Sequence, residues 1–474
     1  MNPMNSLSKT DVHIFEIRGN FFLLDVEGNK LFSLSPDAYK CAVDRINGNE
    51  TDPQTFSAWR AGRKLDKIWK NIISLTPEHV EDVRQRLETP IPPLTGLWLG
   101  LAHTCNLGCT YCFANEPNYL LNKNPLMSWE MAKRAVDFLI EREPERMQFG
   151  LIFFGGEPLL QFDLIKRIVD YCCQLQEQGK KFTYAITTNG TLLTPEIYNY
   201  MVSYNFSIML SLDGTKTIHD HNRPYLDGRP SWDNIMDNLK QLNDVARNIM
   251  ARVTVQDVQV PLIEIYKTMR AAGFQDVALV EICPNSGEIP VFPEKDIPVW
   301  KEQYLNLAEY IAETEARAYD GALSSLSGYV QALRERERSF YCCSTGIRSF
   351  YVTPDGDLYP CMRLISDDRK NIMGSIFTSL DAQKVNHFVQ NNIMNKSCRK
   401  CWARYLCGGM CYGDSFAVSG DIRKPISEYC KITRHKIEVA AYILKRLKES
   451  GKIRQHSDGN IFNKMAKGLR ILRN

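Results

Sequence analysis

The chain has 474 residues, of which 44% are hydrophobic and 24% are charged, and its formal net charge at pH 7 is only +3. A chain of this length is expected to form roughly three domains of about 100–200 residues each. The composition excludes a disordered protein, and the balanced charge argues against a nucleic-acid partner.

The sequence has no apolar run close to the roughly 18 residues of a membrane span, and its start, MNPMNSLSKTDV, lacks the layout of a signal peptide. We therefore expect a cytoplasmic protein with no membrane partner, whose thiols stay reduced. It nevertheless has 15 cysteines, and clustered cysteines in that compartment indicate metal rather than disulfides. The isolated cysteines are expected to be small buried hydrophobic residues: Cys41, Cys172, Cys173 and Cys283.

Residues 11–34 alternate between apolar and polar side chains, with turn residues at Gly19-Asn20 and at Glu27–Asn29. This pattern predicts short strands, and Phe21–Leu24 is a candidate edge strand. Ser35 is a candidate cap for a helix, and helical segments continue from it to the Pro-rich stretch TPIPPLTG. The N-terminal region is therefore expected to consist of strands followed by helices.

Six apolar, strand-like runs alternate with helical ones in the next 200 or so residues. Repeated strand–helix units predict a parallel sheet covered by helices, here an α/β fold with a partial (β/α)6 barrel. Active sites of such sheets lie at the carboxyl ends of the strands. The residues at or near the expected strand ends are Cys105, Gly155, Asn189, Ser211 and Arg252.

The rest of the chain is divided by composition and periodicity. A segment rich in cysteine and glycine follows a stretch with the periodicity of long helices, and it needs metal to hold it together. A basic tail with the composition of a solvated helix ends the chain. The expected parts are an N-terminal domain (1–90), a barrel (97–295), a helical bridge (296–340), a cysteine-rich domain (341–435) and a final helix with its tail (436–474).

Three cysteines, Cys105, Cys109 and Cys112, lie in the stretch HTCNLGCTYCFAN with the spacing C-x3-C-x2-C. Three thiolates on one loop can bind one face of a cube-shaped [4Fe–4S] cluster, which leaves one iron open to bind a reacting molecule. A structural zinc site would need a fourth ligand such as His103, at an uncommon spacing. The absence of a fourth cysteine favours the cluster.

With Tyr111 before its last cysteine, this loop resembles the signature of radical S-adenosylmethionine (radical SAM) enzymes. Further motifs of that family follow in order on successive predicted strands. They are FGGEP at 154–158, TTNG at 187–190, SLDG at 211–214 and HDHNRP at 219–224. Each motif is weak alone, but the ordered set is specific, and the resemblance extends over about 97–290.

The resemblance implies that Cys105, Cys109 and Cys112 are catalytic, because they hold the cluster whose open iron chelates SAM. An electron from that cluster would split SAM into methionine and a 5′-deoxyadenosyl radical, which abstracts an unactivated hydrogen. Val277–Val280 would line the adenine, and Arg223 rivals Arg252 as the cation near the SAM carboxylate. The residues implied for SAM binding are Gly155, Gly156, Glu157, Asn189, Ser211, Asp213 and Arg252.

The later cysteines resemble a SPASM domain, whose pattern is C-x(9–15)-G-x4-C, then C-x2-C-x5-C-x3-C, then C. By count alone, their seven thiolates are nearly enough for two clusters, and a pair of zinc sites is the alternative. The resemblance implies two auxiliary [4Fe–4S] clusters, hence three clusters in the chain. One would be held by Cys398, Cys401, Cys407 and Cys430, and the other by Cys343, Cys361 and Cys411.

The second auxiliary cluster lacks a ligand in this assignment. The neighbouring Cys342 could supply it, although adjacent cysteines in an extended chain point in opposite directions. Alternatively, one iron stays open and binds a substrate thiolate.

The N-terminal region resembles, in layout, the winged-helix-like recognition element that binds leaders of ribosomally made peptides through a strand edge. A stabilising extension is the alternative. With the barrel and the SPASM domain, this layout resembles thioether-forming maturases of the sactipeptide and ranthipeptide type. The expected partners are a precursor peptide, bound through its leader, and an electron donor such as flavodoxin or ferredoxin.

Two other kinds of function remain open from the sequence alone. The first is another radical oxidation on the same scaffold, either a carbon–carbon crosslink or formylglycine formation in a sulfatase. The second is an iron–sulfur electron carrier or sensor. No local pattern identifies a catalytic base, the acceptor residue or the oligomeric state.

Overall fold

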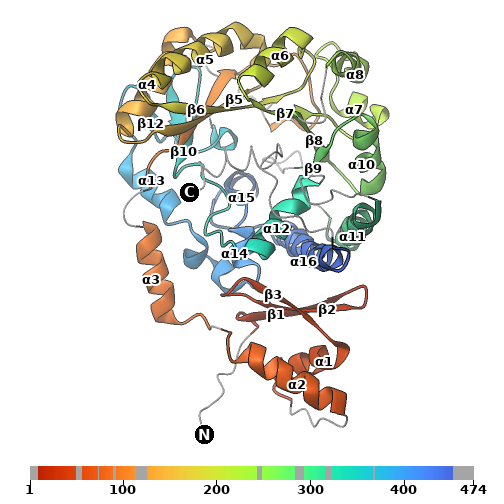
Figure 1. Ribbon diagram of the computed structural model, residues 1–474. Helices are drawn as coiled ribbons and strands as arrows, with labels where there is room; N and C mark the ends of the chain where they lie inside the picture. The colour runs from red at the N-terminus through yellow and green to blue at the C-terminus, as the bar shows by residue number, and fades with distance from the viewer. Residues whose placement is uncertain are drawn as a thin grey trace.

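The computed structural model describes residues 9–49, 56–72, 74–88, 92–113, 125–242, 248–282, 293–314, 323–366 and 369–451. Within these ranges the strands form one sheet of three strands and one of nine. Figure 1 shows the larger sheet curving through the upper part of the molecule, with helices on its outer side, and the smaller sheet below it. In the same ranges, no helix is both long and apolar enough to span a bilayer.

The smaller sheet is antiparallel and consists of β1 (Val12–Ile17), β2 (Asn20–Asp25) and β3 (Lys30–Leu34). The expected edge position of Phe21–Leu24 is wrong, because these residues lie in β2, which pairs with β1 on one side and β3 on the other. The turns at both ends of β2 fold its neighbours back along opposite edges. Among the strands that the structure describes, β1 and β3 are therefore the edges of this sheet.

Three helices follow this sheet, namely α1 (Pro36–Ile46), α2 (Phe56–Trp69) and α3 (Pro77–Glu88). The predicted cap is confirmed, because the Ser35 hydroxyl accepts a hydrogen bond of 3.3 Å from the amide of Ala38. This bond satisfies one of the amides that the first turn of a helix leaves unpaired.

The six predicted barrel strands are confirmed and are all parallel. They are β4 (Gly96–Ala102), β5 (Gln148–Gly155), β6 (Lys181–Thr188), β7 (Ser207–Ser211), β8 (Ile249–Val255) and β9 (Asp276–Glu281). The helices between them are α4 (Trp129–Arg142), α5 (Phe162–Gln176), α6 (Pro195–Ser203), α7 (Lys216–Asn222), α8 (Trp232–Lys240) and α10 (Leu262–Ala271). The curved sheet with outer helices in Figure 1 is the expected partial barrel.

The cysteine-rich region contributes strands to this same sheet, which the sequence pattern does not predict. Strand β10 (Ser349–Val352) pairs in parallel with β4, and β11 (Asp357–Tyr359) and β12 (Gly374–Ser375) extend the sheet beyond it. All four residues of β10 are buried. The cysteine-rich region is therefore anchored to the barrel by backbone hydrogen bonds as well as by side chains.

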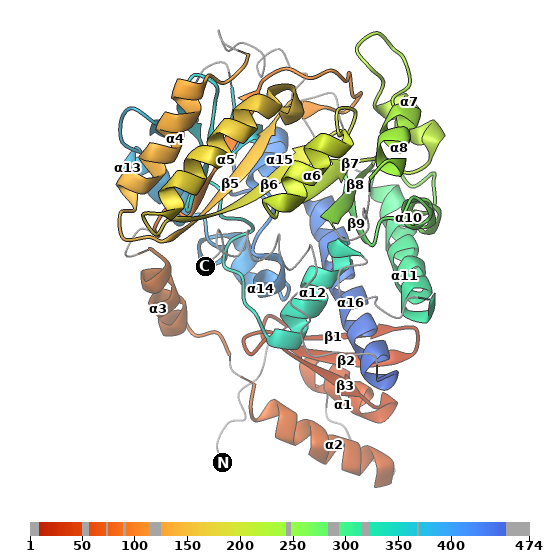
Figure 2. The same ribbon diagram turned by 45° about the horizontal axis from the view of Figure 1, so that its top comes forward.

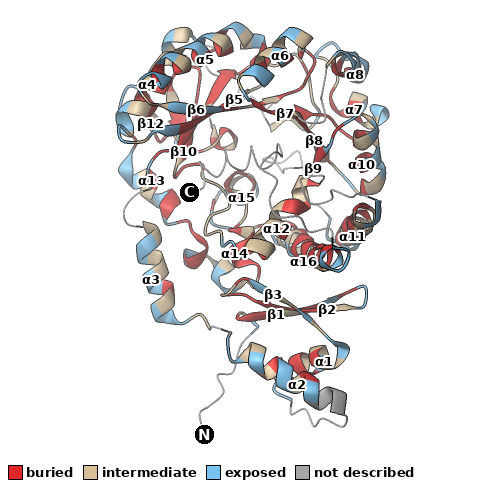
Figure 3. Cartoon of the chain, in the orientation of Figure 1, coloured by how far each residue is buried: buried red, intermediate tan, exposed pale blue. Residues whose placement is uncertain are grey.

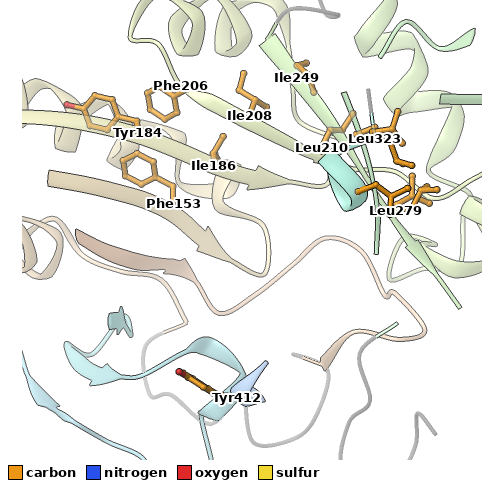
Figure 4. Close-up of a cluster of buried hydrophobic side chains, with 14 of the residues drawn as sticks. Phe153, Tyr184, Ile186, Phe206, Ile208, Leu210, Ile249, Leu279, Leu323 and Tyr412 are labelled. Atoms are coloured by element: carbon orange, nitrogen blue, oxygen red, sulfur yellow. The ribbon is translucent and has the colours of Figure 1, made fainter. Parts of the chain in front are cut away.

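Side chains of the barrel strands alternate between two environments. Those on the helix side form the main core, and Figure 4 shows Phe153, Tyr184, Ile186, Phe206, Ile208 and Leu210 gathered there. The opposite, inner face carries Met209, Met250, Ala278 and Val280, which form a separate small cluster. Because alternate residues of a strand share a face, Arg252 lies on this inner face between Met250 and Thr254.

The long helix α16 (Ser427–Glu449) joins the parts of the molecule. It packs against α11 (Ile297–Thr314) and α12 (Ser324–Glu335), and it also reaches β1. Figure 2 shows α16 running from the barrel toward the small sheet, and Figure 3 shows buried residues where these elements face one another. The remaining helices are α13 (Ala382–Val389), α14 (Arg404–Cys407) and α15 (Tyr412–Ser419).

The isolated cysteines mostly lie where they were expected. Cys41 and Cys172 are buried, and Cys173 is half-buried. Cys283 lies outside the described residues, as does the basic tail from Lys452 onward.

A buried carboxylate, Glu27, fastens the small sheet to the cysteine-rich region. It pairs with the fully buried guanidinium of Arg404 and accepts a hydrogen bond of 2.8 Å from the hydroxyl of Tyr405. Nearby, the ring of His13 stacks on Trp402 with centroids 3.6 Å apart. Residues 402–405 lie between Cys401 and Cys407, so the small sheet is held directly on a cysteine-bearing segment.

His13 also binds α16. Its Nε2 lies 2.9 Å from Oε1 of Glu438, and His435 lies 3.5 Å from the other oxygen of that carboxylate. Burial opposes ionisation of Glu438, but the hydrogen bonds from both histidines outweigh it and hold the pKa of Glu438 at about 2.

We expect Glu27→Ala to lower the free energy of unfolding by about 3–5 kcal/mol, because it leaves the buried Arg404 charge without its partner. Urea denaturation of the anaerobically purified chain measures this. Glu81→Ala is the control, since Glu81 forms an exposed pair with Arg84 at 3.1 Å and such pairs contribute at most about 1 kcal/mol. Equal losses in the two variants would show that the buried pair does not hold the small sheet.

Candidate functional site

The three-cysteine loop begins directly after β4, at the carboxyl end of the strand. Backbone hydrogen bonds tie it to the HDHNRP segment, from the amide of Gly108 to the carbonyl of Pro224 at 2.8 Å and from Thr110 to Asn222 at 2.9 Å. The thiol of Cys109 interacts electrostatically with those of Cys105 and Cys112. The three thiols therefore lie near one another on this loop.

Burial disfavours the ionised, thiolate form of these cysteines. It raises the pKa of Cys105 to about 11 and that of Cys109 to about 12, because a buried anion loses its hydration. In the described part of the chain, no three histidine, cysteine, aspartate or glutamate side chains converge as one metal ion would require. Sulfurs that bind different irons of one cluster need no such convergence, so the donor set fits a cluster.

His103, the alternative zinc ligand, has its ring nitrogen Nε2 bound elsewhere. It lies 2.9 Å from the hydroxyl of Tyr351 on β10, and burial lowers the pKa of His103 to about 4. A Cβ at Gly100 would come within 2.1 Å of that hydroxyl, so glycine on β4 makes room for it. His103 thus bonds to β10, where the barrel meets the cysteine-rich region.

The two glycines of the GGEP motif lie directly beneath the cysteine loop. The amide of Gly156 donates to the carbonyl of Ala102 at 2.7 Å, and that of Glu157 donates to Thr104 at 3.1 Å. A Cβ at Gly156 would lie 2.2 Å from the carbonyl oxygen of Thr104. Gly155 has a φ of +137°, and a Cβ there would lie 2.2 Å from the carbonyl oxygen of Ala102. These glycines permit the close approach of β5 to the loop.

The carboxylate of Glu157 points into the protein and binds the TTNG motif. It accepts hydrogen bonds from the hydroxyl of Thr188 at 2.8 Å and from the amides of Asn189 and Leu159 at 2.7 and 2.9 Å. Burial raises the pKa of Glu157 to about 7, and these bonds only partly offset it. Its side chain therefore joins the ends of β5 and β6.

Asn189 makes the side-chain link between the strand ends and the cysteines. Its Nδ2 lies 3.7 Å from the sulfur of Cys105 and 2.9 Å from Oδ1 of Asn106. Its own Oδ1 accepts hydrogen bonds from the amide and hydroxyl of Thr191 at 3.0 and 2.7 Å. The predicted site residue Asn189 thus contacts a cysteine of the loop.

Asp213 is completely buried at the centre of a second network. It accepts a hydrogen bond of 2.5 Å from Tyr111 and one of 3.0 Å from the amide of Thr254, and it pairs with Arg223 at 3.0 Å. Burial opposes its charge, but Arg223 and the hydrogen bonds hold the pKa of Asp213 below its ordinary value. Asp213 therefore connects the cysteine loop, the HDHNRP segment and β8.

The HDHNRP motif now has a structural explanation that its sequence did not supply. The ring of His219 accepts a hydrogen bond of 3.1 Å from the amide of Asp213, and its other nitrogen lies 3.0 Å from the hydroxyl of Ser231. That hydroxyl donates to the carbonyl of Arg223 at 2.6 Å. The motif fixes the Asp213–Arg223 pair, and in the sequence it was marked only by its resemblance to the family motif.

The two candidate cations for a SAM carboxylate differ in their surroundings. Arg223 is paired with Asp213, whereas Arg252 has no ion-pair partner among the described residues. Arg252 pairs in register with Ser211 and with Ala278. Because paired residues of neighbouring strands share a face, these side chains lie together on the inner face. Ala278 and Val280 are the members of Val277–Val280 on that face.

The later cysteines fall into two groups. Cys407 interacts electrostatically with Cys398, Cys401 and Cys430, the group implied for one auxiliary cluster. Burial raises the pKa of Cys407 to about 12. All of these cysteines are half-buried, in segments that include the start of α16 and the loop that binds the small sheet.

The second group contains four cysteines. The sulfurs of Cys342 and Cys343 lie 3.6 Å apart, Cys342 interacts with Cys411, and Cys361 interacts with Cys343. The chain turns at this point instead of running extended, so the adjacent side chains point to the same side. Cys342 thus lies with Cys343, Cys361 and Cys411, the three cysteines implied for the second auxiliary cluster, and it brings their number to four.

An aromatic cluster lies between the first loop and the second cysteine group. Tyr351, Tyr359 and Met362 form its buried part, and both Cys112 and Cys361 pack against it. The residues that complete it are Trp98, Phe113, Phe154, Ile365 and Ile372. The two cysteine sites therefore share one hydrophobic wall.

Comparison with known proteins places this geometry among related chains. A family model for the radical SAM superfamily matches residues 100–259. The chain is 25% identical over 358 residues to the serine-type anaerobic sulfatase-maturating enzyme of Bacteroides thetaiotaomicron, covering 69% of this chain and 84% of that protein. It is 31% identical over 275 residues to an uncharacterized protein of Methanocaldococcus jannaschii, covering 56% and 85%.

Two solved structures have a similar fold. Native anSMEcpe with bound AdoMet matches with a TM-score of 0.64 at 20% identity, covering 76% of this chain and 100% of that chain. Streptococcus suis SuiB bound to precursor peptide SuiA matches with a TM-score of 0.50 at 14% identity, covering 87% and 97%. The overall fold is therefore one that solved structures share.

We expect Gly156→Ala to reduce the iron that the anaerobically reconstituted chain binds by about four atoms. The new Cβ would meet the carbonyl oxygen of Thr104 at 2.2 Å and the Cβ of Cys105 at 3.1 Å, so the loop must shift. Iron and sulfide analysis measures the loss.

Gly108→Ala is the matched control within the loop, because a Cβ there meets nothing closer than 3.7 Å. It should bind as much iron as the unchanged chain. Full iron content in Gly156→Ala would mean that the glycine is not needed for the loop to bind its cluster.

Proposed function

This chain belongs to the radical SAM superfamily, and we propose that it is a cytoplasmic maturase that forms thioether crosslinks in a ribosomally made precursor peptide. In that reaction a cysteine sulfur becomes bonded to a carbon of an acceptor residue. The observation that carries the proposal is the small sheet, whose strand β3 pairs only with β2 among the described residues. This sheet is fastened directly to a segment that bears cysteines of the proposed auxiliary clusters. Such an arrangement suits an enzyme that must hold a peptide and modify it at a metal-containing site.

Bound together, the cluster and SAM supply the abstraction of a hydrogen atom from an unactivated carbon. In our proposal, Cys105, Cys109 and Cys112 hold the cluster. Residues of the strand ends and the inner face hold and orient SAM: Gly155, Gly156, Asn189, Ser211 and Arg252. Glu157 and Asp213 support the site from the interior of the protein. Glu157 binds the end of β6, and Asp213 binds Tyr111 of the cysteine loop.

The two later cysteine groups are proposed to hold auxiliary [4Fe–4S] clusters, which makes three clusters in the chain. We assign Cys398, Cys401, Cys407 and Cys430 to one, and Cys342, Cys343, Cys361 and Cys411 to the other. The sulfur of Cys342, 3.6 Å from that of Cys343, supports a fourth protein ligand in the second cluster. With four cysteines, that cluster would exchange electrons with a carrier such as flavodoxin or ferredoxin.

The leader of the precursor peptide is proposed to bind the small sheet. In the described part of the chain, β3 pairs with β2 alone, and its residues Lys30–Leu34 are exposed or half-buried. An extended peptide can add to such an edge through backbone hydrogen bonds. Streptococcus suis SuiB, which has a similar fold, was solved with a precursor peptide bound, and this supports a peptide substrate here. The division into 1–90, 97–295, 296–340, 341–435 and 436–474 is part of this proposal.

A second candidate is formylglycine formation in a sulfatase, favoured by the similarity to the sulfatase-maturating enzyme of Bacteroides thetaiotaomicron. A carbon–carbon crosslink is a further oxidation that the same site could perform. A non-catalytic electron carrier is the candidate from another class. Each predicts a different outcome of the same incubation.

The test is an anaerobic incubation of the reconstituted chain with SAM, a reductant and a cysteine-containing precursor peptide. A thioether removes two hydrogen atoms from the peptide and also removes a thiol that iodoacetamide can alkylate. We expect both changes in one product, together with 5′-deoxyadenosine, and neither in Cys105→Ala/Cys109→Ala/Cys112→Ala.

Other products would contradict the proposal in distinct ways. Loss of two hydrogens with the thiol still alkylatable would indicate a carbon–carbon crosslink. A product that reacts with a hydrazide probe would indicate formylglycine. An iron-replete chain that makes no 5′-deoxyadenosine would indicate an electron carrier.

We expect Cys342→Ala to leave the second auxiliary cluster with an open iron, because one of its four ligands is removed. In the Cys105→Ala/Cys109→Ala/Cys112→Ala background, which removes the first cluster and its open iron, added cyanide or a small thiol should then change the Mössbauer and EPR signals of the reduced variant, while the same background with Cys342 intact does not respond. Cys173→Ala is the control, since Cys173 is half-buried on the barrel helix α5. Binding of the probe by the background chain that keeps Cys342 would show that Cys342 is not a ligand.

A further inference from the structure

Lys396 stands at a junction between the two later cysteine groups. It immediately precedes the short turn Ser397–Lys400, which carries Cys398. Its ammonium group interacts electrostatically with Cys342 and Cys343 of one group and with Cys398 and Cys407 of the other. This lysine therefore faces cysteines of both groups.

The contacts of its terminal nitrogen locate the ammonium more closely. A Cβ built at Gly409 would lie 3.4 Å from Nζ of Lys396, so the nitrogen lies against the backbone between Cys407 and Cys411. Those two cysteines belong to different groups. Nζ also lies 5.0 Å from the ring centroid of Tyr412, which is labelled in Figure 4 and is 2% exposed.

The charge of Lys396 is not neutralised by a carboxylate in the described part of the chain, where none lies within 4.0 Å of its nitrogen. By comparison, the buried Lys436 pairs with Glu281, and Arg363, which interacts with Cys361, pairs with Asp414 at 2.5 Å. A charge without a counterion, held partly away from water, acts over a longer distance than a solvated surface charge.

We infer that the ammonium group of Lys396 raises the reduction potentials of both auxiliary clusters. The inference rests on the proposed function, in which the two cysteine groups hold these clusters. A fixed positive charge stabilises the additional electron of a reduced cluster on either side of it. When one electron passes between them, one cluster is oxidised and the other reduced, and no bond or proton changes.

Arg434 offers a matched comparison, because it approaches only one group. It interacts with Cys398 and Cys430, and it is exposed on α16. Its charge is screened by water, and its effect should be confined to the cluster of that group. Lys424 is an exposed lysine on the loop before α16 and serves as a surface control.

The experiment is a redox titration followed by EPR spectroscopy on the reconstituted full-length chain. Cys105→Ala/Cys109→Ala/Cys112→Ala is used as the background, so that only auxiliary signals remain. We expect Lys396→Met to move both midpoint potentials to more negative values. Lys396→Arg, which keeps the charge, should restore both, whereas Arg434→Met should move one at most and Lys424→Met neither.

The inference fails if Lys396→Met leaves both potentials unchanged, or if it moves only one of them, because the ammonium then does not act on both clusters. Loss of auxiliary iron from both Lys396→Met and Lys396→Gln would also overturn it, since the lysine would then serve cluster assembly. If the background chain itself binds no auxiliary iron, the cluster assignment of the proposed function fails, and iron analysis separates that result from the others.

Discussion

The parallel pairing of β4 on both of its edges is the constraint on which the arrangement of the sites depends. One edge of β4 pairs with β5 of the barrel and the other with β10 of the cysteine-rich region. The first cysteine loop begins where β4 ends, so its position is set relative to both neighbours at once. The bond between His103 and Tyr351 closes this arrangement at the carboxyl end of the strands.

Around this strand, buried carboxylates hold neighbouring segments of the chain together. Asp213 holds the cysteine loop against the HDHNRP segment and β8, and Glu157 holds the ends of β5 and β6 together. Glu27 does the same for the small sheet and the cysteine-rich region. Each carboxylate is surrounded by donors, as a buried charge requires. Their shared effect is to reduce the freedom of the segments that carry cysteines.

The thiolate forms of these buried cysteines are unfavourable until a positive charge binds them. Burial raises the pKa of Cys105, Cys109, Cys361 and Cys407 to between about 11 and about 12, so a thiolate forms there only with a compensating positive charge. Iron supplies that charge in our proposal, and binding then contributes to the stability of the region. The ammonium of Lys396 is one part of this compensation that the chain itself provides, together with Arg363 near Cys361 and Arg434 near Cys430.

The sequence by itself determined the strand order of the barrel, the cysteine loop, the motifs at the strand ends and the capping of α1 by Ser35. These features depend on local periodicity and spacing, which short stretches of sequence carry. Only the tertiary structure decided that Phe21–Leu24 is a central strand, that β10 joins β4, and that the sulfurs of Cys342 and Cys343 lie on the same side. The pairing of Glu27 with Arg404, which are 377 residues apart in the sequence, was likewise decided only by the tertiary structure. Such pairings are set by the packing of distant segments, and no local pattern of side chains encodes them.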